Sequence, residues 1–83
     1  MSDFGRGRWK AAFPDLAHFI ETEVKPIVND VGKSYVFALQ ESFELYGQEG
    51  VAHQLLYIAN NLKRVKGSGI VRKGLENWNA KLA

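Results

Sequence analysis

The chain has 83 residues, no cysteine and a formal net charge of +2 at pH 7. Hydrophobic residues make up 46% of the sequence, which indicates one globular domain and excludes a disordered tail. The missing cysteines exclude disulfides and cysteine-based zinc sites and favour a cytoplasmic location, and no apolar run approaches membrane-spanning length.

The N-terminal residues 1–13 are rich in glycine and basic side chains, and we expect them to form a flexible arm. Pro14 suits the first turn of a helix, where a missing N–H costs nothing, and apolar residues then repeat at helical spacing. Pro26 interrupts this repeat, which predicts either a kink or two short helices, and residues 30–32 predict a turn.

The rest of the chain shows three more apolar stripes with helical spacing and no clear strand pattern. The predicted helices run from about Lys33 to Tyr46, from about Gln48 or Gly50 to Val65, and from about Ser68 to Lys81. We therefore predict an all-α fold, a compact bundle of four to five short helices after the flexible arm, with a single domain over residues 14–83.

Side chains with catalytic potential are scattered along the chain. His18 and His53 have no partner at metal-ligand spacing, and Glu21 and Glu23 would point away from each other on a helix. The segment 67–69 is too short for a phosphate-binding loop, and no serine has a nucleophile-elbow setting. We expect no enzyme activity, no metal site and no cofactor.

The charges are strongly segregated along the chain. Residues 15–50 are mainly acidic, whereas residues 51–83 have only Glu76 against six basic side chains. Such a cluster can neutralise the phosphates of a nucleic acid, although a solvated basic surface has the same composition. The candidate nucleic-acid-binding residues are Lys63, Arg64, Lys66, Arg72, Lys73 and Lys81. Trp9, in the predicted arm, is a candidate accessory residue for base stacking, or it packs back onto the helices.

The run from Ile70 to Trp78 resembles the end of the DnaD-like domain, whose motif is Tyr, three residues, Ile, three residues and Trp. Leu75, Asn77 and Trp78 match the pattern of that family. Ile70 stands where the family has Tyr, and Gly74 stands where it has Ile, which permits close packing against a neighbouring helix.

Two upstream segments extend this resemblance to roughly residues 16–80. The run from Phe19 to Pro26 looks like the family's opening segment, and the predicted helix that ends at Tyr46 is similar to its second helix. The resemblance implies a DNA-binding domain of replication-initiation and primosome proteins from Gram-positive bacteria, their phages and their plasmids. In such proteins this domain helps to recruit the replicative helicase loader, with DNA contacts that correspond here to Arg72, Lys73, Lys81 and the accessory Trp78.

The expected partners are therefore single- or double-stranded DNA and replication proteins such as an initiator or helicase loader. We expect no membrane partner. Two alternatives fit the same sequence. One is a protein adaptor that docks its partner through an apolar patch around Phe37 and Tyr57, and the other is a small phage or plasmid regulator that binds a host protein. A domain with so modest a core also suits a homo-oligomer.

Overall fold

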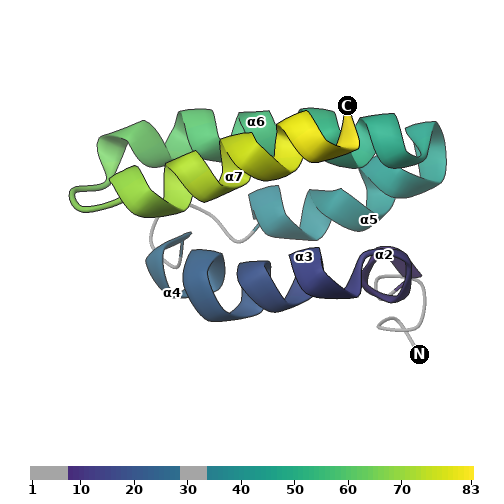
Figure 1. The fold of residues 1–83 in the computed structure, drawn as a ribbon, viewed down its shortest axis with the longest axis horizontal. Helices are drawn as coiled ribbons and strands as arrows, with labels where there is room; N and C mark the ends of the chain where they lie inside the picture. The colour runs from purple at the N-terminus through teal and green to yellow at the C-terminus, as the bar shows by residue number, and fades with distance from the viewer. Residues whose placement is uncertain (1–7, 29–33) are drawn as a thin grey trace.

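The computed structural model describes residues 8–28 and 34–83, and every regular element in these two ranges is helical. This confirms the predicted all-α fold (Figure 1). The elements in chain order are α2 (Arg8–Ala12), α3 (Pro14–Phe19), the π-helical turn η1 (Ile20–Val24), α4 (Lys25–Val28), α5 (Ser34–Tyr46), α6 (Gln48–Asn61), the 3₁₀ turn η2 (Leu62–Arg64) and α7 (Gly69–Leu82). The turn predicted over residues 30–32 lies outside the described residues.

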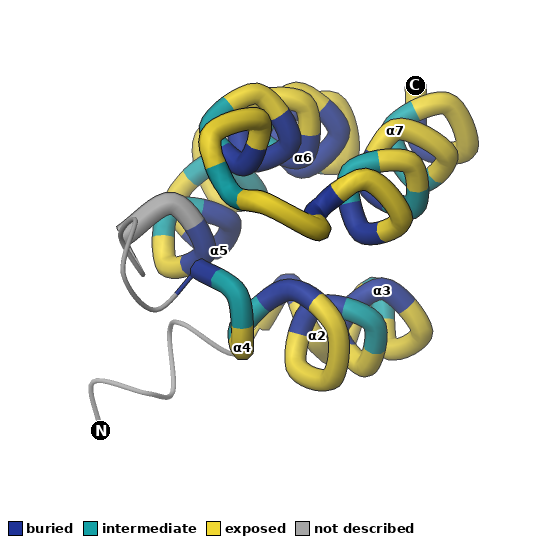
Figure 2. The backbone as a smooth tube through the Cα atoms, turned by 90° about the vertical axis from the view of Figure 1, so that its left-hand side faces the viewer, coloured by how far each residue is buried: buried dark blue, intermediate teal, exposed yellow. Residues whose placement is uncertain are grey.

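The helices pack as a bundle around one core. Helices α5 and α6 form an antiparallel hairpin, and α7 returns along α6, while the continuous rod of α3, η1 and α4 lies on the opposite side of the bundle (Figure 1). Figure 2 shows that the buried sides of these helices turn toward a common centre. Side-chain amides help to fix α7 on α6, because Asn79 Nδ2 donates to the Ala52 carbonyl at 2.8 Å and Gln48 Nε2 donates to the Leu82 carbonyl at 2.9 Å.

The apolar stripes of the sequence supply this core. On α6 and η2 the buried stripe is Val51, Leu55, Ile58 and Leu62. On α7 the buried residues are Val71, Leu75 and Leu82, with Trp78 half-buried at their edge. The helical periodicity therefore predicted both the existence of these helices and the face that each one turns inward.

The irregularity predicted at Pro26 takes the form of a π-helical turn, and the chain stays helical through the proline to Val28. The Lys25 N–H donates to the Ile20 carbonyl, five residues earlier, instead of to the residue four earlier. Because Pro26 has no N–H and its ring crowds the preceding turn, the wider π turn accommodates it without ending the helix.

The segment 1–13, predicted to be a flexible arm, contains a short helix in its described part. Residues 1–7 lie outside the described residues, but α2 begins at Arg8 and buries Trp9, whose exposed fraction is 2%. The backbone N–H of Trp9 donates to Gln40 Oε1 of α5 at 2.8 Å, so a contact between distant parts of the sequence holds this short helix. Trp9 belongs to the core and is not exposed for base stacking.

Two glycines allow neighbouring helices to approach closely. A Cβ atom on Gly50 of α6 would collide with the Ser42 carbonyl oxygen of α5 and lie 2.9 Å from Tyr46 Cβ. A Cβ atom on Gly74 of α7 would lie 2.6 Å from the ring of Phe19, as its predicted role in close packing requires. The obstacle at Gly50 is backbone, which moves less easily than the end of a side chain.

We expect Gly50→Ala to lower the free energy of unfolding by about 2 kcal/mol, because the added methyl group forces α5 and α6 apart. The matched control is Gly69→Ala in the first turn of α7, where an added Cβ meets nothing within 4 Å. Urea denaturation of both variants measures the difference. Equal stability of the two variants would contradict the close α5–α6 contact.

Candidate nucleic-acid interface

Five of the six predicted cations gather where α6 gives way to α7. Lys63 and Arg64 lie in η2, Lys66 lies in the connection, and Arg72 and Lys73 lie in the first half of α7. We call these five residues the basic corner. Gly67, with a φ of 79°, turns the chain between the two helices, in a backbone region that glycine adopts without strain.

Buried hydrogen bonds hold the backbone of the basic corner. Ser68, with an exposed fraction of 1%, donates its hydroxyl to the Leu62 carbonyl at 2.7 Å. The same hydroxyl oxygen accepts from Arg72 Nε at 3.1 Å, and the Ser68 carbonyl accepts from the Arg72 N–H at 2.8 Å. Ser68 thereby joins the end of α6 to the start of α7.

No cation of the basic corner forms an ion pair within the described residues, although Glu76 lines a depression together with Lys63 and Glu23 lines one together with Lys73. The ion pairs found in residues 8–28 and 34–83 are Arg8–Glu44, Lys10–Glu21 and Lys25–Glu21, and none involves a cation of the corner. The first turn of α7 contains no acidic residue, so the positive end of its helix dipole adds to the charge. This arrangement produces a positive potential suited to an anionic partner.

Lys81 is the predicted site residue that the fold sets apart from the other five. It lies nine residues after Arg72 on α7, which is roughly 13 Å along the axis and half a turn around it. Its ammonium group lies 4.5 Å from the ring centroid of the half-buried Trp78, in a cation–π contact. Lys81 and Trp78 therefore form a separate feature near the C-terminal end of α7.

The acidic part of the sequence is partly paired with N-terminal cations. Glu21 lies 2.9 Å from Lys10 and 3.2 Å from Lys25. The hydrogen bond from Lys10, aided by that from Lys25, lowers the pKa of the Glu21 carboxyl group despite partial desolvation. Glu44 pairs with Arg8 at 3.4 Å, whereas Glu41 and Glu49 are exposed. Glu21 and Glu44 thus pair with cations of the N-terminal helices and not with those of the basic corner.

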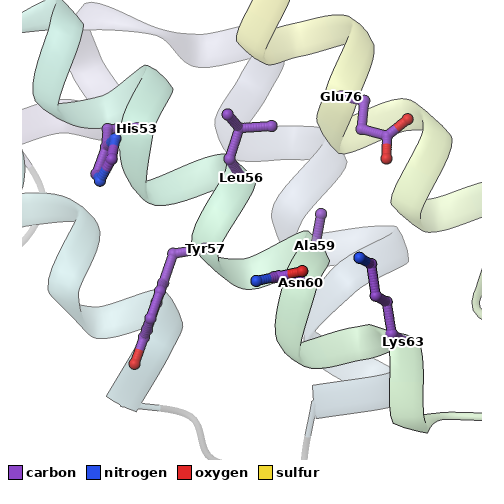
Figure 3. A pocket seen from close by; sticks show the side chains of 7 residues that line it. All are labelled: His53, Leu56, Tyr57, Ala59, Asn60, Lys63 and Glu76. Carbon is purple, nitrogen blue, oxygen red and sulfur yellow. The ribbon is translucent and has the colours of Figure 1, made fainter.

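A shallow depression on the outer side of α6 begins beside the basic corner, and the helical pattern alone did not predict it. It has a volume of about 420 Å³. Figure 3 shows its lining. Five side chains come from α6, one from η2 and one from α7: His53, Leu56, Tyr57, Ala59, Asn60, Lys63 and Glu76. Ala59 is buried at the floor of this depression, whereas Leu56 is exposed.

The predicted absence of catalysis stays a prediction. His18 and His53 are exposed on α3 and α6, and the described residues contain no group of three or more histidine, cysteine, aspartate or glutamate side chains placed to hold a metal ion. Within the same residues, no helix has the length and apolarity needed to cross a membrane.

Comparisons with protein-family models, with curated proteins and with solved structures find no match for this chain. The fold and the surface define the class to which the molecule belongs: a small all-α bundle with basic side chains around the connection between its last two helices.

Proposed function

We propose that this domain binds DNA through the basic corner and serves as an accessory domain in the initiation of replication. The observation that carries the DNA part of the proposal is the gathering of Lys63, Arg64, Lys66, Arg72 and Lys73 around one connection, without a carboxylate partner among the described residues. Contacts from such a surface reach phosphates, which fix position and carry no base code.

The replication part of the proposal depends on the resemblance of the segment 70–78 to the DnaD-like domain. By that resemblance, the domain would act in the cytoplasm and help an initiator or helicase loader to reach DNA. In the fold, Val71 and Leu75 of this segment are buried, whereas Arg72 and Lys73 are more accessible. The segment thus contributes packing on one side and charge on the other, as a phosphate-binding helix requires.

The direct test is binding of labelled single-stranded and duplex oligonucleotides at low salt, followed by fluorescence anisotropy. We expect both to bind, with little dependence on base sequence, and we expect the complexes to dissociate as salt rises. Absence of binding to either oligonucleotide at low ionic strength would refute the DNA part of the proposal.

The second candidate function is a protein adaptor, and the exposed apolar side chains of the hairpin support it. Phe37 and Leu45 of α5 and Leu56 and Tyr57 of α6 are each more than two-fifths exposed. Phe37 and Tyr57, around which the adaptor patch is predicted, belong to the two helices of this hairpin. A partner that stays bound at high salt would favour this function over DNA binding.

A further inference from the structure

Arg72 differs from the other cations of the basic corner in how it is held. Lys63, Arg64, Lys66 and Lys73 are exposed, whereas Arg72 is half-buried. Its Nε atom donates to Ser68 Oγ at 3.1 Å, and within the described residues no other cation of the corner donates a side-chain hydrogen bond. An exposed lysine must lose rotamer freedom when it engages an anion, but Arg72 has lost part of that freedom on folding.

The chemistry of the hydroxyl group fixes the direction of the two hydrogen bonds at Ser68. A serine hydroxyl has one proton to donate and two lone pairs that accept. Ser68 uses its proton on the Leu62 carbonyl at 2.7 Å, so its oxygen is left to accept from Arg72. The guanidinium group is thus connected through Ser68 to the backbone at the end of α6, which is itself packed in the core through Leu62.

This connection leaves the terminal nitrogens of the guanidinium group for a partner. Nε is engaged on the protein side, and the two terminal NH₂ groups retain the planar geometry that matches two oxygens of one phosphate. A lysine at this position would keep the charge but would lack both the Nε bond to Ser68 and the paired donors.

We propose that Ser68 is a positioning residue that holds Arg72 for a phosphate, and that Arg72 is the strongest single phosphate contact of the basic corner. This inference rests on the proposed DNA binding and ranks the cations of the basic corner by their contribution to DNA affinity. It also predicts that a buried, uncharged serine affects that affinity.

The test is a double-mutant cycle on binding of a duplex oligonucleotide, with Lys73→Gln as the matched loss of one charge. We expect R72Q to lower affinity about tenfold and K73Q about threefold, because the hydrogen bonds of a positioned arginine add to the charge that each variant loses. S68A should lower affinity about threefold in the wild-type background and leave affinity unchanged in the R72Q background. Thermal unfolding of each variant identifies a temperature at which all variants are folded, and binding is measured at that temperature.

The variant R72K keeps the inference testable even if S68A fails to fold. It preserves the charge, and we expect its affinity to fall nearly as far as that of R72Q. Wild-type affinity in R72K, or an equal effect of S68A in both backgrounds, would overturn the role of Ser68 and Arg72 while DNA binding stands. If the wild-type domain itself binds no oligonucleotide, the proposed function fails, and this inference fails with it.

Discussion

Reversal of charge at both Arg72 and Lys73 should weaken DNA binding about 100-fold or more at low salt. The double variant R72E/K73E removes two of the five cations of the basic corner and adds two repulsive charges in their place. Because the lost contacts are to phosphates, the affinity should fall by a similar factor for every base sequence. Anisotropy titrations with several unrelated oligonucleotides measure the effect, and circular dichroism confirms that the helices persist.

Reversal of the charge of one residue outside the basic corner provides the control for the change in net charge. K81E changes the net charge of the molecule as much as K73E does, but Lys81 lies near the other end of α7 over the ring of Trp78. We expect K73E to reduce affinity several times more than K81E. If the two single reversals weaken binding equally, the DNA contacts are not confined to the basic corner.

Removal of the Trp9 side chain should be the most destabilising single change at the N-terminal end of the domain. Trp9→Ala should lower the free energy of unfolding by about 3 kcal/mol, since the indole is 2% exposed and its loss leaves a cavity between α2 and the bundle. That is a large fraction of the stability of a domain of this size. Urea denaturation measures the loss, and Trp9→Phe, which refills part of the space, should lose less.

Fluorescence provides an independent check on the placement of Trp9. In the variant W78F, Trp9 is the remaining tryptophan. Because it is buried in the core, its emission should be blue-shifted and should not respond to added DNA. An emission typical of exposed indole, or quenching of Trp9 by DNA, would instead support the base-stacking role that the sequence allowed for this residue.

The long helices could be predicted from sequence because their apolar residues repeat strongly. The stripe Val51, Leu55, Ile58 and Leu62 fixes both the position of α6 and its buried face. The boundaries of α5, α6 and α7 differ from the predicted ones by only a few residues, apart from the end of α6, where the chain tightens into the 3₁₀ turn η2. Turns of this kind are common at helix ends and leave no clear sequence signal.

Helix α2 could not be predicted in the same way. It has five residues, too few for a periodic pattern, and the neighbouring glycines favour an arm. Tertiary contacts hold it: the indole of Trp9 lies in the core, and the backbone N–H of Trp9 donates to the side chain of Gln40, which is buried although polar. Contacts between residues so far apart in the chain are not visible in local spacing.

The sequence predicted which residues form the candidate site, but it predicted their spatial arrangement only in part. Spacing placed Lys63, Arg64, Lys66, Arg72 and Lys73 near one connection, and the fold brings them together there. Helical spacing already puts Lys81 half a turn from Arg72, but the sequence did not predict the contact of Lys81 with the ring of Trp78. Nor did spacing predict the hydrogen bonds that Ser68 makes with Leu62 and Arg72.

The dependence of DNA affinity on salt tests the central claim most directly. A plot of log affinity against log salt should be linear, with a slope between about −2 and −4.5, since each engaged phosphate contributes about −0.9. Substitution of Lys63 or Lys73 by glutamine should make the slope shallower by about 0.9, whereas Lys81→Gln should leave it unchanged. A slope near zero for the wild-type domain, or a slope that responds to Lys81 and not to Lys63 and Lys73, would contradict binding of phosphates by the basic corner.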